Sequence, residues 1–326
     1  MMQTHFDYIF DTNLDFDSAC EAIFDWQMEH NSVYRGFVEN LGGSGAWRPM
    51  LPVEAFRDAR VYAAGAHEPE LFFQSSGTST SVRSRHEVAF SSVYRKSILA
   101  GMKLFYPLEN MVVLGYTPGY NENPNSSLIW MINALIDNDS SGLSRFLNVG
   151  EPISQKLIDE ISSRDLRVLL FGAAFGLADL AEENPIILPE DSIIMETGGM
   201  KTYRREITRE ELHFLLSEGF GIQVEDIHSE YGMTEMLSQS YSSGDGWFRS
   251  PPWVRVSVRN ALNPIEEVPD GEEGLIGVVD LANWASCPFI LTGDRGVRRW
   301  DGGFKVLGRW SQFHLRGCNF LMDAER

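Results

Sequence analysis

The sequence predicts an α/β fold joined to a smaller, β-rich subdomain. In the middle of the chain, short apolar runs alternate with stretches of helical periodicity, an order typical of βαβ units around a parallel sheet. From about residue 254, the pattern changes to short strands separated by Asp-Gly turns. With 326 residues, 43% of them hydrophobic, the chain can bury one large core or two smaller ones.

The predicted elements follow from periodicity and from local start and stop signals. Helical spacing of apolar residues predicts helices over 18–34, 87–105, 127–136 and 153–162. A further helix starts at Thr208, where Thr208-Arg209-Glu210-Glu211 fits a capping box, and is expected to run to about residue 217 and stop at Gly219. Strands are predicted over 111–114, 167–171, 192–195, 224–227, 254–258, 275–279 and 304–307.

The most apolar stretch, residues 166–181, is too short and too charged to span a bilayer, because it has 16 residues and includes Arg167 and Asp179. A buried strand followed by a turn is the expected structure. The N-terminus carries acidic and aromatic residues without an apolar core, so no signal peptide is expected.

The charge balance excludes two classes of partner. The chain has 46 acidic and 27 basic residues, a net charge of −19, which argues against a broad nucleic-acid footprint and against adhesion to anionic membranes. An anionic ligand is expected only where backbone N–H groups or a local Arg/Lys cluster offset this charge. The three cysteines, Cys20, Cys287 and Cys318, have no CxxC spacing, so neither a disulfide framework nor a zinc ribbon is indicated, and a cytoplasmic setting is expected.

Residues 75–81 are the most unusual local feature. Six of the seven are Ser or Thr and the other is Gly77, with Arg83 and Arg85 close behind. A glycine turn with successive N–H and hydroxyl groups can surround a phosphate, although a solvated polar loop has the same composition. No Gly-Lys-Ser/Thr follows at the spacing of a Walker A loop.

Three further motifs place polar groups after predicted strands. Residues 231–235 read Tyr-Gly-Met-Thr-Glu, residues 292–294 read Thr-Gly-Asp, and residues 308–309 read Gly-Arg. We expect each motif to lie just beyond the end of a short strand, where α/β proteins bind ligands.

In their order, these four motifs resemble the adenylate-forming superfamily of acyl-CoA synthetases, adenylation domains and firefly luciferase, whose motifs read roughly TSGTTGxPK, YGxTE, TGD and GRxxD. Thr80 stands where the second glycine of the loop is usual, and Arg83 where lysine is usual. Within the superfamily, the chain is most similar to the acyl-protein synthetases (LuxE-type), with the phenylacetate-CoA ligases as neighbours. Gly198-Gly199-Met200-Lys201 after a strand and the ending Arg316-Gly317-Cys318 indicate this branch, and the resemblance covers about residues 70–320.

The resemblance implies ATP- and Mg²⁺-dependent activation of a fatty or aryl acid as an acyl-adenylate, with release of pyrophosphate. The acyl group then passes to a thiol, on Cys318, an acyl-carrier protein or CoA. The implied catalytic residues are Glu235, which also holds the metal, Thr234, on the α-phosphate, and Cys318. Asp294 is expected on the ribose, Arg309 on ribose or phosphate, and Tyr231 near the base. The implied nucleotide-binding residues are Ser75, Ser76, Gly77, Thr78, Ser79, Arg83, Gly198, Gly199, Tyr231, Gly232, Asp294 and Arg309.

We expect an α/β subdomain with the phosphate-binding loop over residues 1–195, a second α/β to β-rich subdomain over 196–310, and a tail with Cys318 over 311–326. The fold resembled is the large N-terminal domain of adenylate-forming enzymes. Only residues 310–326 follow Arg309, so the usual lid domain of about 100 residues and its catalytic lysine are expected to be missing.

Alternatives stay open at this stage. The altered loop and the short C-terminus also suit a catalytically degenerate subunit that binds a nucleotide or acyl chain. Cys318 suits either acyl acceptance or a buried core position, whereas Cys20 and Cys287 are expected in the core. His86 and His228, close to the motifs, suit either the active site or a structural role. No G-x-S-x-G elbow supports a serine hydrolase.

Overall fold

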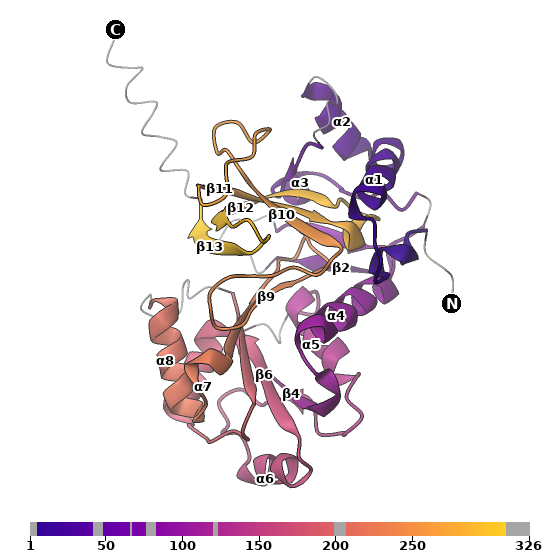
Figure 1. The fold of residues 1–326 in the computed structure, drawn as a ribbon. Coiled ribbons are helices and arrows are strands. Elements are labelled where there is room, and N and C mark those ends of the chain that lie inside the picture. Colours follow the sequence, from indigo (N-terminus) through magenta and orange to yellow (C-terminus); the bar gives the residue numbers. More distant parts are fainter. Residues whose placement is uncertain are drawn as a thin grey trace.

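The computed structural model describes residues 5–41, 48–65, 67–75, 83–119, 123–198 and 207–310. Within these ranges the strands form a six-stranded sheet, a five-stranded sheet and a separate hairpin. In Figure 1 the five-stranded sheet lies in the upper half and the six-stranded sheet in the lower half, with α7 and α8 on one side of the lower sheet and α4 and α5 on the other.

The six-stranded sheet has the order β5-β4-β6-β7-β8-β9. Its first five strands in that order are parallel, and β9 is an antiparallel edge strand. The strands are β4 (Met111–Tyr116), β5 (Arg145–Phe146), β6 (Arg167–Ala173), β7 (Ile193–Thr197), β8 (Ile227–Tyr231) and β9 (Ser240–Ser242). This is the arrangement of an α/β fold in which helices cover both faces of a parallel sheet.

Alternation along β4 divides the core between the two faces of this sheet. Met111 and Val113 point into the core cluster shared with α4 (Ser91–Phe105) and α5 (Ser127–Ile136), whereas Val112 and Leu114 point into a second cluster. Helices α6 (Gln155–Ser163), α7 (Ala174–Glu183) and α8 (Arg209–Phe220) contribute to that second cluster. Burial on both faces explains why the central strands β4 and β6 are mostly apolar rather than alternating with polar residues.

The five-stranded sheet has the order β1-β12-β11-β10, with β13 paired to the same β12. This sheet pairs an early strand with a late one. Strand β1 (Leu51–Pro52) runs parallel to β12 (Phe289–Arg298). The other strands, β10 (Val254–Arg259), β11 (Glu273–Asp280) and β13 (Phe304–Arg309), are antiparallel. The hairpin of β2 (Leu71–Gln74) and β3 (Arg85–Val88) flanks the hydroxyl-rich loop.

The remaining elements are short or lie near the N-terminus. They are η1 (Asp7–Phe10), α1 (Phe16–His30), α2 (Ser32–Asn40), α3 (Ala55–Asp58), η2 (Leu108–Asn110), η3 (Val224–Asp226) and η4 (Leu281–Asn283).

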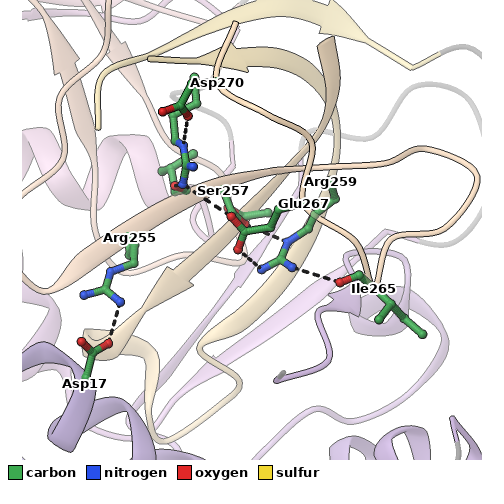
Figure 2. A network of polar contacts seen from close by, with 10 residues as sticks. Asp17, Arg255, Ser257, Arg259, Ile265, Glu267 and Asp270 are labelled. Carbon is green, nitrogen blue, oxygen red and sulfur yellow. Dashed lines mark hydrogen bonds and ion pairs between the residues drawn. The ribbon is translucent and has the colours of Figure 1, made fainter. Parts of the chain in front are cut away.

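A polar network fastens the connection between β10 and β11 to the sheet (Figure 2). Arg259, only 5% exposed, pairs with Glu267 at 3.1 Å and donates to Ser257 Oγ at 2.9 Å and to the Ile265 carbonyl oxygen at 3.4 Å. Burial of a guanidinium is tolerated here because several acceptors surround it.

Several predicted elements are confirmed. Helix α5 has the predicted bounds, strands β4, β6, β10, β11 and β13 contain the predicted runs, β7 begins one residue after its predicted start, and the Thr208–Glu211 capping box is present at the start of α8. Both Asp-Gly turns contain a glycine with positive φ, Gly271 at 88° and Gly302 at 84°. The proposed subdomain boundary at residue 195 falls inside β7, and the division of the chain stays a proposal.

The prediction of one helix over residues 18–34 is wrong. The chain breaks at Asn31, whose backbone is extended and whose side chain accepts a hydrogen bond from the Tyr34 backbone N–H, so that α1 ends and α2 begins there. A side chain that caps a helix start competes with helix continuation.

The predicted helix over 87–105 begins too early. Residues 85–88 pair with β2 instead, and α4 starts at Ser91, whose backbone N–H donates to the Glu70 carboxylate at 2.8 Å. The turn expected after β6 is in fact helix α7, because apolar periodicity and burial cannot separate these two outcomes in a short run.

Two further boundaries differ. Helix α8 continues past Gly219 to Phe220 and is capped by Gly221, which has a left-handed φ of 66°. Gly219 lies so close to α7 that an added Cβ would be 2.6 Å from that of Ala181. The strand predicted over 224–227 is largely the 3-10 turn η3, and β8 begins at Ile227.

The three motifs that were expected to follow strands therefore lie largely inside strands. Tyr231 is the last residue of β8, residues 292–294 lie in the middle of β12, and Gly308 and Arg309 end β13. The prediction that Thr-Gly-Asp follows a strand is wrong, because β12 continues as a partner for both β11 and β13.

Candidate active site

Glu235 lies in the turn after β8 and contacts the chain just after the hydroxyl-rich loop. Ser84 Oγ donates a 2.5 Å hydrogen bond to Glu235 Oε1. The Glu235 residue is 6% exposed, and burial raises the pKa of its carboxyl, while the Ser84 hydroxyl and the charge of Arg309 act in the opposite direction. The carboxyl is thus a nearly buried oxygen ligand beside the loop.

Asp294 forms the second polar centre of the site. Its Oδ2 accepts a hydrogen bond from the Tyr231 hydroxyl at 3.0 Å, and its Oδ1 lies 3.0 Å from Arg309 Nε. Register explains the second contact, because Asp294 on β12 pairs directly with Arg309 on β13. Gly293 leaves room for the guanidinium, since an added Cβ would lie 3.0 Å from Arg309 Nη1.

The ring of Tyr231 is largely buried. It is 9% exposed and packs edge-to-face on Phe304 with centroids 5.5 Å apart, with Phe248 at 5.8 Å. Burial raises the pKa of the Tyr231 hydroxyl, so the group stays protonated and donates to Asp294. Tyr231 therefore orients Asp294, and its expected place near the base stays a prediction.

Buried side chains hold the segment that contains Thr234 and Glu235. The His86 ring lies between the Thr234 carbonyl oxygen and Asn283, and Asn283 donates to the Glu235 carbonyl oxygen. Asp280 accepts from the Leu237 backbone N–H at 2.8 Å and from Ser238 Oγ at 2.6 Å. Burial lowers the pKa of His86 to about 4, against the effect of its two contacts, and raises the pKa of Asp280 to about 6.

A pair of buried acidic residues lies at the carboxyl ends of β7 and β8. Glu230 accepts a hydrogen bond from Thr197 Oγ1, and Glu196 accepts one from Ser229 Oγ at 2.5 Å. Burial raises the pKa of Glu230 to about 7, with the Glu196 charge acting in the same direction. An added Cβ on Gly232 would be 2.4 Å from Glu230 Oε1, so this motif glycine permits a close approach.

The other expected nucleotide-binding residues divide into two groups. Ser75 is partly buried and its backbone N–H lies 3.4 Å from the Ser84 carbonyl oxygen, Arg83 is exposed, and Gly198 is exposed with a φ of 80°. The expected residues that lie outside the described ranges are Ser76, Gly77, Thr78, Ser79, Gly199 and Cys318. As expected, Cys20 and Cys287 are buried.

The structure thus brings together Glu235, Asp294, Arg309, Tyr231 and Ser84, which follows the hydroxyl-rich loop in sequence. The sequence analysis missed other residues that contact this site, namely Ser84, Glu230, Asp280 and Asn283. The position of Ser84 next to the hydroxyl-rich loop could have indicated it from the sequence. No sequence pattern indicates Asp280 or Asn283, because they reach the site only through the pairing of distant segments.

Within the described ranges, no three His, Cys, Asp or Glu side chains are gathered so as to hold a metal ion, and no helix is long and apolar enough to cross a membrane.

Comparison with solved structures shows the same α/β fold in adenylate-forming enzymes. A 2-hydroxyisobutyryl-CoA ligase, solved in complex with 2-HIB-AMP and CoA, superimposes with a TM-score of 0.62 at 12% identity, over 90% of this chain and 68% of that one. ATP-bound MatB from Rhodopseudomonas palustris superimposes with a TM-score of 0.53 at 16% identity, over 76% of this chain. The chain spans about half the length of MatB, 49%.

Two known proteins are also similar to this chain in sequence. The long-chain-fatty-acid–luciferin-component ligase of Aliivibrio fischeri is 24% identical over 309 residues, covering 86% of this chain and 78% of that protein. The Vibrio harveyi protein of the same description is 25% identical over 143 residues, covering 41% of this chain and 37% of that protein. The family model described as acyl-protein synthetase, LuxE, matches residues 159–325, just over half of the sequence. The chain therefore belongs to the acyl-protein synthetase (LuxE) family.

Proposed function

We propose that this chain uses ATP to activate a carboxylic acid, of the fatty or aryl class, as an acyl-adenylate, and then transfers the acyl group to a thiol. The observation that carries this proposal is the convergence of Glu235 with Ser84 on one side and of Asp294 with Arg309 and Tyr231 on the other. Similarity to a long-chain-fatty-acid–luciferin-component ligase and to a 2-hydroxyisobutyryl-CoA ligase solved with 2-HIB-AMP supports it.

In the first step, a carboxylate oxygen of the acid attacks the α-phosphorus of ATP, the bond to the β-phosphate oxygen breaks, and pyrophosphate leaves. The protein must align these atoms and offset the phosphate charge. Thr234 would donate to the α-phosphate, Arg309 would face ribose or phosphate, and Asp294 would accept from ribose hydroxyls. Since Arg309 and Tyr231 already hold its carboxylate, Asp294 is oriented before the nucleotide arrives.

Mg²⁺ fits the donor set. Glu235 offers a hard carboxylate oxygen, and Mg²⁺ usually takes one or two carboxylates together with phosphate oxygens and water. When bound, the ion would neutralise charge on the phosphates. The task of this chain is to keep Glu235 ionised and fixed, which the Ser84 hydroxyl favours by donating to it.

In the second step, a thiol sulfur attacks the acyl carbonyl carbon, AMP leaves and the thiol proton passes to solvent. The proposed acceptors are Cys318, an acyl-carrier protein or CoA. A thioester conserves the activation of the acid for a later transfer.

Pyrophosphate exchange into ATP over a panel of fatty and aryl acids tests the proposal. Exchange with at least one acid is expected in the purified protein and should be lost in Glu235→Gln, with an unchanged melting temperature. Glu21→Gln, an exposed carboxylate on α1, is the matched control and should keep full exchange. No exchange with any acid and no ATP binding would refute the proposal. ATP binding without exchange would favour the non-catalytic subunit instead.

A further inference from the structure

Two polar side chains without any exposed surface lie beneath the turn that contains Thr234 and Glu235. His86 on β3 and Asn283 in η4 are each 0% exposed, and His86 Nε2 lies 2.9 Å from Asn283 Oδ1. They come from segments almost 200 residues apart, so only the tertiary fold pairs them. Such groups are costly to bury unless they are hydrogen-bonded.

The contacts of Asn283 fix the direction of its amide. Asn283 Nδ2 donates to the Glu235 carbonyl oxygen at 2.8 Å and to the Cys287 carbonyl oxygen at 2.9 Å. The reverse orientation would set an amide oxygen against two carbonyl oxygens, so Oδ1 must face His86. Both amide hydrogens are thereby used, one of them on Glu235.

His86 holds the preceding residue. Its Nδ1 lies 2.8 Å from the Thr234 carbonyl oxygen, and its ring packs edge-to-face on Phe56 with centroids 5.6 Å apart. A neutral imidazole has a single N–H, so with the hydrogen on Nδ1 His86 donates to the Thr234 carbonyl oxygen, while its Nε2 only contacts Asn283 Oδ1. The carbonyl oxygens of two consecutive residues, Thr234 and Glu235, are therefore held by two neighbouring side chains, His86 and Asn283. Asp280 fixes the far end of the same segment at Leu237 and Ser238.

We propose that His86 and Asn283 are positioning residues, which fix the backbone at Thr234 and Glu235 so that the hydroxyl and the carboxyl of these residues face the nucleotide together. This inference rests on the proposed function, in which both side chains act on ATP. Neither His86 nor Asn283 touches substrate. Their effect passes through two backbone carbonyl groups, in the way that outer-shell hydrogen bonds orient metal ligands.

The sharpest variant is Asn283→Asp, which keeps the shape of the side chain but replaces its two N–H donors with an oxygen. In the protein without ligands, amide hydrogen exchange over residues 231–240 should become faster, while exchange in β6 stays unchanged. In the pyrophosphate-exchange assay, kcat should fall about 10- to 100-fold, with the KM for the acid almost unchanged and a higher Mg²⁺ requirement.

Asn31→Asp is the matched control. Asn31 is also a fully buried amide that donates to a backbone carbonyl, that of Ser286 at 2.9 Å, in the same region of the fold. Both variants should lose stability, but only Asn283→Asp should change hydrogen exchange over 231–240 or the Mg²⁺ requirement. If the two variants behave alike in both respects, the positioning role is refuted.

His86→Gln gives a second measurement if Asn283→Asp folds poorly. It should also speed exchange over 231–240, and the double variant should be less impaired than the product of the two single effects, because the pair acts as a unit. Additive effects would contradict a pair. If the unmodified protein exchanges pyrophosphate with no acid, the proposed function fails, whereas the hydrogen-exchange measurement still decides whether the pair holds this segment.

Discussion

Ser84 Oγ donates a 2.5 Å hydrogen bond to Glu235 Oε1 and so joins two segments that lie 151 positions apart in the sequence. The contact brings the chain just after the hydroxyl-rich loop against the turn that carries the proposed metal ligand. It also acts on the charge of that ligand, since a donated hydrogen bond favours the ionised carboxyl.

Ser84→Ala should therefore shift the pH dependence of the enzyme. Burial raises the pKa of Glu235 and the Ser84 hydroxyl lowers it, so removing the hydroxyl raises the pKa further. Because the ionised carboxylate is the active form, the acid limb of the kcat profile for pyrophosphate exchange should move to higher pH. An unshifted acid limb with a uniformly lower rate would show that Ser84 acts only on structure.

Tyr231→Phe should weaken ATP binding more than catalysis. The change removes the donor to Asp294 Oδ2 and leaves that carboxylate with Arg309 alone, so the KM for ATP should rise several-fold and the stability fall by about 1 kcal/mol. Tyr34→Phe is the control, because the buried Tyr34 hydroxyl donates to the Pro49 carbonyl oxygen at 2.7 Å. It should cost similar stability without changing the KM for ATP.

Glu230→Gln should change how stability depends on pH. Burial raises the pKa of Glu230 to about 7 from its ordinary 4.5, so the folded state favours the protonated carboxyl. Its contribution to stability is fully present below pH 4.5 and is lost as the pH rises through about 7. Glutamine stays neutral, so the stability of the variant relative to the unmodified protein should rise between these values. Urea denaturation at several pH values measures this difference, and a constant difference would contradict the shift.

Two glycines should respond to alanine in opposite directions. Gly219→Ala places a Cβ 2.6 Å from that of Ala181 and should destabilise the packing of α8 on α7 by about 1–3 kcal/mol. In α2, an added Cβ at Gly36 has no atom within 4 Å, so Gly36→Ala should stabilise by up to about 1 kcal/mol. The melting temperatures of both variants test this prediction. Equal shifts in melting temperature would mean that the packing around Ala181 adjusts to the added Cβ without cost.

Cys318→Ser tests the proposed acyl acceptor. The variant should keep pyrophosphate exchange and lose a covalent acyl-enzyme that hydroxylamine cleaves. Cys287→Ser should retain that label, because Cys287 is fully buried and burial raises the pKa of its thiol to about 12. Labelled acid that stays attached to Cys318→Ser through a hydroxylamine-sensitive bond would exclude Cys318.

The sequence by itself determined the α/β class, the ordered motifs and most element centres. Apolar runs that lie inside a parallel sheet and capping signals such as Thr208 are local properties, so they can be recognised without the fold. Local patterns did not determine the start of α4 or the extent of β12, because in both cases a partner distant in sequence sets the boundary.

Only the tertiary structure decided how the motifs meet. Strand register places Arg309 opposite Asp294, and the turn η4 carries Asn283 to Glu235. No spacing in the sequence encodes these contacts, since each depends on which strands become neighbours and on which face a side chain points. Burial then sets the chemistry of the site by raising the pKa values of Glu230, Glu235 and Asp280, an effect that exists only once the chain has excluded water.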